Sequence, residues 1–91
     1  MRYQWVRWLH DTPTEPVLLY PEIDNDGFEV RKIDEYADRH RDTASRDGHS
    51  GSTHLGAVPV PSLDAINAQD EFVGEEINAA EFERIWVATQ E

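Results

Sequence analysis

The sequence predicts an α+β fold, an antiparallel β-meander sheet with C-terminal helices packed on one face. Two runs of β-favouring residues flank the Asp26-Gly27 pair, which is typical of a hairpin turn. An aromatic-rich run lies at the N-terminus, and the last part of the chain has helical periodicity. Strands that precede helices favour separate layers. At 91 residues the chain is expected to be a single domain, residues 1–91.

Residues 3–10 are expected to form the first strand, because they are rich in aromatic and β-favouring types. Large apolar side chains alternate on both of its sides: Tyr3, Trp5 and Leu9 on one, Val6 and Trp8 on the other. A strand of this kind is expected to be central and covered on both faces. His10, at its end, is expected to anchor the strand through a hydrogen bond.

Residues 17–36 are expected to form a hairpin with Asp26-Gly27 as a two-residue loop. This register places Glu22 opposite Arg31, Tyr20 opposite Ile33, and Ile23 opposite Val30, so charges and apolar groups match. A three-residue loop over residues 25–27, with Gly27 as a bulge, is the alternative. It would set Glu22 against Val30 and matches fewer pairs.

Side chains alternate along the hairpin, so it has two unlike faces. The expected core face carries only apolar groups: Val17, Leu19, Ile23, Phe28, Val30 and Tyr36. The opposite face is half apolar and half charged, with Leu18, Tyr20, Ile33, Glu22, Glu29 and Arg31. Pro21 lacks an N–H donor and predicts an edge strand or a bulge.

The second half of the chain combines a loop-rich stretch with two expected helices. Residues 37–45 can extend the second hairpin strand and begin a third, residues 46–56 are glycine-rich and expected to be mobile, and residues 55–60 are expected to be extended. Ser62 is the expected cap of a short helix. Phe72, Val73 and Ile77 are expected to point inward. In the final helix, Asn78 and Glu81 have capping-box spacing. Its apolar stripe is Phe82, Ile85, Trp86 and Thr89.

Composition excludes several classes of protein. The net charge is −11, and residues 61–91 hold eight acidic residues against Arg84 alone. Such a surface repels phosphate backbones and attracts basic proteins, so no nucleic acid is expected as a partner. The chain has no cysteine, which removes disulfides, thiolate zinc sites and cysteine nucleophiles. No run of about 20 apolar residues is present, so no membrane is expected and the protein is expected to be soluble and cytoplasmic.

The chain resembles a family of small, uncharacterised bacterial proteins classed as a domain of unknown function. The matching pieces are Trp8-Leu9-His10, residues 15–20 (EPVLLY), residues 29–32 (EVRK), residues 60–63 (VPSL) with Ile66-Asn67, and residues 81–83 (EFE) followed by Trp86. They are spread over nearly the whole chain. The resemblance implies membership of a single-domain family, and it implies no catalytic residue, cofactor or mechanism.

The sequence offers few candidates for metal-binding or catalytic residues. Asp24 and Asp26 lack the spacing of a calcium loop, because Gly27 follows the second Asp directly. The histidines of residues 40–54 (His40, His49 and His54) follow no metal-binding pattern, and no G-x-S-x-G elbow accompanies the serines. We therefore expect no catalytic residue, no metal and no cofactor. Arg31 is expected to pair with Glu22, with anion binding as the alternative.

The leading functional prediction is a non-enzymatic module that docks onto another protein. If the helices cover only one sheet face, the other exposes a binding patch made of Val6, Trp8, Leu18, Tyr20 and Ile33, with Arg31 beside it. Size and charge suggest an immunity or antidote protein that blocks a basic toxin. Two alternatives are a small-ligand-binding or hydrolytic protein that uses the loop of residues 40–54, and a homo-oligomer formed through the sheet edge or the open face.

Overall fold

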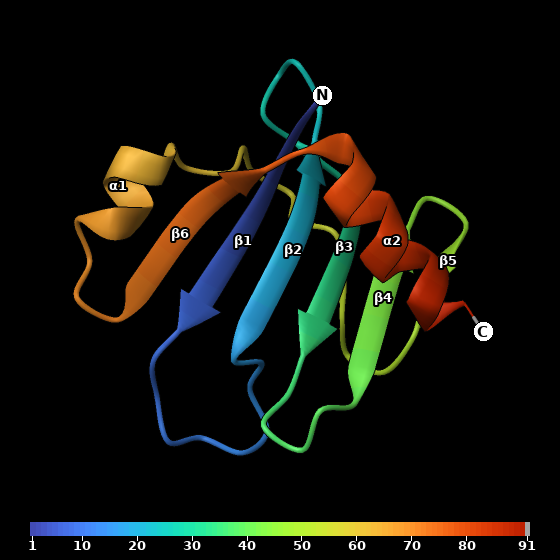
Figure 1. Ribbon diagram of the computed structural model, residues 1–91, viewed down its shortest axis with the longest axis horizontal. Coiled ribbons are helices and arrows are strands. Elements are labelled where there is room, and N and C mark those ends of the chain that lie inside the picture. Colours follow the sequence, from blue (N-terminus) through green and yellow to red (C-terminus); the bar gives the residue numbers. More distant parts are fainter. Residues whose placement is uncertain (91) are drawn as a thin grey trace.

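The computed structural model describes residues 1–90 and contains one antiparallel sheet of six strands, in the order β5-β4-β3-β2-β1-β6 (Figure 1). The strands are β1 (Arg2–Trp8), β2 (Leu18–Ile23), β3 (Glu29–Glu35), β4 (Arg41–Ser45), β5 (Gly48–His49) and β6 (Phe72–Ile77). The helices are α1 (Leu63–Asn67) and α2 (Ala79–Thr89). The first five strands form a meander, and β6 returns to pair with β1. The predicted α+β fold is confirmed.

Strand β1 lies inside the sheet, as predicted, because β2 pairs on one side of it and β6 on the other. The sequence pattern did not identify β6 as a strand. Val73, which was predicted to point inward, is 44% exposed. It lies opposite Arg7, on a part of the sheet that no helix covers.

The loop of the hairpin contains three residues, so the two-residue prediction is wrong. The Asp24 carboxylate accepts hydrogen bonds from the N–H groups of Asp26 (2.9 Å) and Phe28 (3.0 Å), and the N–H of Asp24 donates to the carbonyl of Phe28. Gly27 has φ +90°, a conformation that favours glycine. The Asp24 side chain therefore stabilises the longer loop.

The predicted pairing beyond the loop is nevertheless confirmed for Glu22 with Arg31 and Tyr20 with Ile33. A β-bulge absorbs the additional loop residue, since Ile23 pairs with Glu29 while Glu22 pairs with Arg31. The expected pair of Ile23 with Val30 is wrong for this reason.

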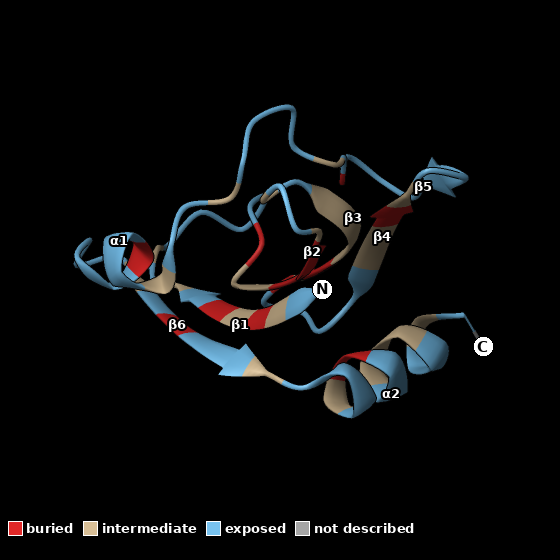
Figure 2. Ribbon diagram, turned by 90° about the horizontal axis from the view of Figure 1, so that it is seen from above, coloured by how far each residue is buried: buried red, intermediate tan, exposed pale blue. Residues whose placement is uncertain are grey.

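The two helices lie on opposite faces of the sheet (Figure 2). Helix α2 covers the front face of Figure 1, where Phe82 packs on Tyr20 and Ile33. Helix α1 lies on the back face, where Leu63 and Ile66 contact the position of Gly74 beside Val6. Both faces of the sheet carry apolar side chains, so each face needs a cover. The face with Tyr20 and Ile33 is thus a core face, contrary to the predicted assignment.

Both helix N-termini are capped as predicted. The hydroxyl of Ser62 accepts a hydrogen bond from the N–H of Ala65 (3.2 Å), and the Asn78 side chain accepts one from the N–H of Glu81 (2.8 Å). The predicted stripe of α2 is confirmed, with Phe82 fully buried. None of the helices within residues 1–90 has the length and apolar character needed to cross a membrane.

The prediction of an edge position for Pro21 is wrong, because β2 lies between β1 and β3. The ladder between β1 and β2 has pairs at Tyr3 and at Val6 but none at the two residues between them. Pro21 lies in this interval and cannot donate a backbone hydrogen bond there. The sheet therefore accommodates the proline through a local interruption of pairing.

Candidate functional site

The six residues predicted to form a docking patch do not share one surface. The register of β1 with β2 places Val6 opposite Leu19, so Val6 and Trp8 lie on the back face. The other four lie on the front face: Leu18, Tyr20, Ile33 and Arg31. Val6, Tyr20 and Ile33 are at most 7% exposed. Helix α2 covers Tyr20 and Ile33 on the front face, and Val6 is buried on the back face beside α1, so these three side chains are not available to a partner.

Arg31 connects the sheet to α2. Its guanidinium donates two hydrogen bonds to the Glu22 carboxylate (2.7 and 2.9 Å) and also pairs with Glu83 of α2. The same group lies over the rings of Phe82 (4.9 Å) and Trp86 (5.0 Å). Hydrogen bonding from Arg31 lowers the pKa of Glu22, although burial opposes this shift. The predicted Arg31–Glu22 pair is confirmed, and its position gives Arg31 a role in holding α2 on the sheet.

One part of the front face stays open, because α2 lies over the side of the sheet nearer β3 and β4 (Figure 1). The open part contains a front hollow of about 310 Å³, lined by Trp5, Arg7, Val17 and Leu18. The exposed Val73 of β6 lies opposite Arg7, so it extends the apolar area. Of the predicted patch, Leu18 contributes to this hollow. Trp5 and Val73 were not identified from the sequence.

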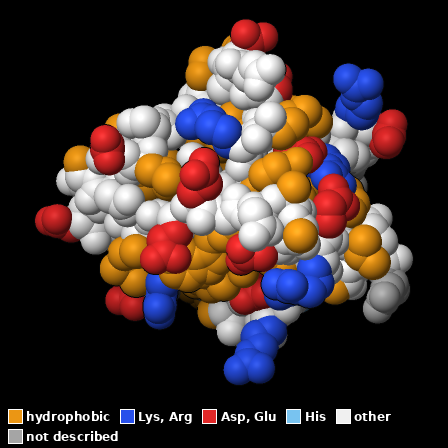
Figure 3. All heavy atoms as spheres, turned by 45° about the horizontal axis from the view of Figure 1, so that its top comes forward, with side chains coloured by type: hydrophobic (Ala, Val, Ile, Leu, Met, Phe, Trp, Pro, Cys, Tyr) orange, Lys and Arg blue, Asp and Glu red, His pale blue; other side chains and the backbone are white. Residues whose placement is uncertain are grey.

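An acidic edge runs along β6 and α1, and it meets the front hollow at Glu75. Between Arg46 and Arg84 the chain has no lysine or arginine. The acidic edge consists of five exposed residues: Asp64, Asp70, Glu71, Glu75 and Glu76. Glu75 lies opposite Trp5 and thus on the front face. Figure 3 shows acidic side chains beside the hydrophobic areas of one side of the molecule.

The outer edge of β6 is partly closed by Asn67 of α1. The Asn67 side chain accepts a hydrogen bond from the N–H of Gly74 (2.7 Å) and donates one to its carbonyl (3.0 Å). These are the backbone groups that a further strand would use. A side-chain amide and the charges of Glu75 and Glu76 therefore disfavour strand addition at this edge.

The histidines are dispersed. His10 accepts a hydrogen bond from the N–H of Thr12 (3.0 Å) through Nδ1, so its Nε2 donates to the carbonyl of Pro16 (2.7 Å). This confirms the predicted anchor at the end of β1. His40 contacts Asp38 (2.5 Å), and the rings of His49 and His54 lie 4.2 Å apart. Within residues 1–90, no three His, Asp or Glu side chains form a group that could hold a metal ion.

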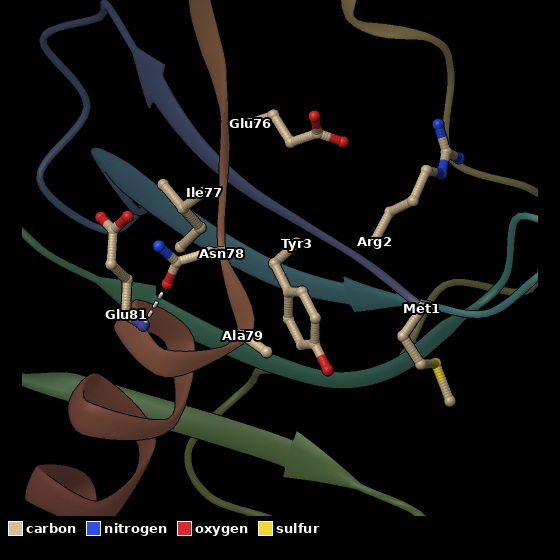
Figure 4. Close-up of a pocket in the computed structure, with 8 residues that line it drawn as sticks. All are labelled: Met1, Arg2, Tyr3, Glu76, Ile77, Asn78, Ala79 and Glu81. Carbon is tan, nitrogen blue, oxygen red and sulfur yellow. Dashed lines mark hydrogen bonds between the residues drawn. The ribbon is translucent and has the colours of Figure 1, made fainter.

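A further hollow, of about 530 Å³, lies beside the N-terminus where β6 leads into α2. Figure 4 shows the ring of Tyr3 between Met1 and Ala79, with the capping bond of Asn78 to Glu81 at one side. Burial and the Glu22 carboxylate raise the pKa of Tyr3, so its hydroxyl stays neutral. Since Met1 and Arg2 are exposed, this hollow is an open depression of the surface.

A buried carboxyl group, Asp34 of β3, lies beside Thr53. Asp34 is 6% exposed, and its Oδ2 accepts a hydrogen bond from the Thr53 hydroxyl (2.9 Å). Its Oδ1 has no hydrogen-bond partner within the described part of the chain. Burial raises the pKa of Asp34 above its ordinary value.

Because the folded protein holds the Asp34 proton more tightly than the unfolded chain, stability falls as the pH rises from about 4 through the folded pKa. Asp34→Asn keeps the acceptor for Thr53 and removes the buried charge. We expect it to raise the free energy of unfolding at pH 7 by about 1 kcal/mol, with a smaller gain at acidic pH. Thermal unfolding of both proteins across pH measures this. The exposed Asp47→Asn is the control, and a fall in melting temperature for Asp34→Asn at pH 7 would contradict the expectation.

Comparison with known proteins identifies a family. A family model described as "Domain of unknown function (DUF6881)" matches residues 2–91. No curated protein and no solved structure matches the chain.

Proposed function

The chain belongs to this family, a domain of unknown function, and we propose that it is a non-catalytic module that binds a basic protein through the front hollow and the acidic edge. The observation that carries the proposal is the position of the hollow. Its apolar lining, with Trp5 and Leu18, lies beside the exposed Val73, which belongs to a stretch of chain that contains no basic residue.

The two parts have complementary roles in this proposal. A tryptophan with aliphatic neighbours is a suitable anchor, because apolar contacts at the centre of an interface supply most of the binding energy. Acidic residues around such an anchor attract a basic partner and accelerate its approach. Arg7 within the hollow would pair with an acidic group of the partner and fix its orientation. An immunity or antidote protein for a basic toxin is the specific role we propose for this arrangement.

The experiment compares two exposed valines. Val73 borders the front hollow and is 44% exposed, while Val87 lies on α2 and is 54% exposed. The wild-type protein, Val73→Asp and Val87→Asp are immobilised and incubated with lysate of the source organism. We expect the wild type and Val87→Asp to retain the same basic protein and Val73→Asp to lose it, because a buried unpaired charge costs at least about 2 kcal/mol, or more than tenfold in affinity.

The second measurement is the amount of basic protein retained at low and at high salt concentration. A contact guided by the acidic edge should form more slowly as ionic strength rises, because salt screens charges beyond about 10 Å at 0.1 M. Retention that is equal for Val73→Asp and the wild type, or that does not change with salt, would contradict the proposal.

A further inference from the structure

A second hollow, the back groove, lies on the opposite face of the sheet. Its floor is formed by Val6 of β1 with Leu19 and Pro21 of β2, and its walls include Ile66, Phe72 and Pro61. The volume is about 230 Å³, which is below the usual range for drug-sized ligands and large enough for a molecule of a single aromatic ring system. The groove is therefore a fragment-sized apolar site.

The two sides of the back groove are attached to the sheet independently. On one side, α1 is held by the two Asn67–Gly74 hydrogen bonds. On the other side, the segment that includes Val60 is held by a hydrogen bond from its N–H to the carbonyl of Gly27 (2.7 Å). Because each wall has its own attachment, the groove is preformed, which lowers the cost of binding.

Gln4 supplies a polar group at this apolar site. It lines the groove, it is 2% exposed, and its Oε1 has no hydrogen-bond partner among residues 1–90. Two other buried polar atoms have no hydrogen-bond partner among residues 1–90. They are Trp8 Nε1 and Asp34 Oδ1, and both belong to side chains of the back face. Leaving a buried acceptor unpaired is unfavourable. A bound molecule that donates a hydrogen bond would remove this cost.

We propose that the back groove binds a small neutral aromatic molecule with one N–H donor, which it presents to Gln4. The rings of Pro21, Pro61 and Phe72 offer flat apolar surfaces that suit an aromatic ring. Glu29 also lines the groove, and the net charge of the protein is −11, so anions are repelled. The donor requirement comes from Gln4 and the size limit from the groove volume.

Indole is the probe, and 1-methylindole is its matched control because it has the same ring system without the donor. Amide chemical shifts of the isotope-labelled full chain are followed as each compound is added. We expect indole to shift the resonances of residues around the back groove and to bind about tenfold more tightly than 1-methylindole, which is the effect of one hydrogen bond. Indole-3-acetate, an anion, should bind more weakly than indole.

Gln4→Leu removes the acceptor and keeps a side chain of similar size. In this variant indole and 1-methylindole should bind equally, whereas the exposed Gln90→Leu should keep the wild-type preference. Val73→Asp should also keep the preference for indole, because Val73 lies beside the front hollow on the other face. The indole experiment therefore tests the back groove independently of the proposed protein partner. Equal binding of the two compounds to the wild type, shifts confined to other regions, or an ordered water on Gln4 that indole does not displace would overturn the proposal.

Discussion

Replacing Phe82 by alanine is expected to lower the free energy of unfolding by about 3–5 kcal/mol. Phe82 is fully buried, its ring centroid lies 5.2 Å from that of Tyr3 and 6.2 Å from that of Trp86, and the guanidinium of Arg31 lies over it. Small domains have about 5–15 kcal/mol in total, so the variant should be close to unfolding. Urea denaturation followed by tryptophan fluorescence measures the loss.

Val87→Ala is the control for Phe82→Ala, because Val87 lies on the same helix and is 54% exposed. Its effect should stay within about 0.5 kcal/mol, apart from the small gain in helix propensity. If Phe82→Ala lowered the free energy of unfolding no more than this control, α2 would not be the cover of the front face. The burial of Tyr20 and Ile33 would then need another explanation.

Local features of this fold could be predicted from the sequence. The pairing of Glu22 with Arg31 and Tyr20 with Ile33 depends on neighbouring strands with matching side chains, and the two helix caps depend on residues three positions apart. The bulge could not be predicted. The loop has one residue more than predicted, stabilised by Asp24, and the bulge takes up this extra residue. The strand register beyond the bulge is therefore the same as with the shorter loop, so the side-chain pairing does not reveal either change.

The assignment of faces could not be predicted, because the hairpin carries apolar side chains on both sides. Which side receives α2 depends on long-range pairing of β6 with β1, and β6 has no alternating pattern to reveal it. The one available signal was Gly74, a glycine between Val73 and Glu75 in the middle of what proves to be β6. A Cβ at this position would lie 3.0 Å from Leu63 Cδ2, so the glycine allows α1 to approach the sheet.

The candidate site was missed for the same reason. Leu18 was identified because it belongs to the hairpin, whose register was available from the sequence. Trp5 and Val73 come from strands that pair across more than 60 residues, and their common surface exists only once β6 lies beside β1. The acidic character of this region was visible in composition, but its position beside an apolar hollow was not.

Arg31→Leu is expected to lower the free energy of unfolding by about 3 kcal/mol at pH 7, because it leaves the Glu22 carboxylate, which is 6% exposed, without its partner. The pH dependence should reverse as well. In the wild type the pKa of Glu22 is lowered, so its contribution to stability is complete above about pH 4.5 and is lost as the pH falls through the folded pKa. In the variant, burial becomes the largest influence on the pKa of Glu22 and outweighs the smaller lowering effects of Tyr3 and the N-terminal amino group, so the pKa should rise and acidification should restore stability.

The double variant Glu22→Gln with Arg31→Leu separates the two roles of Arg31. If the loss comes from an uncompensated buried carboxylate, the neutral glutamine should recover most of the stability at pH 7, and the exposed Arg84→Leu should change little. Urea denaturation of the four proteins at pH 7 and pH 4 measures this. A double variant as unstable as Arg31→Leu would instead assign the loss to the guanidinium over Phe82 and Trp86, since that contact is absent from both variants.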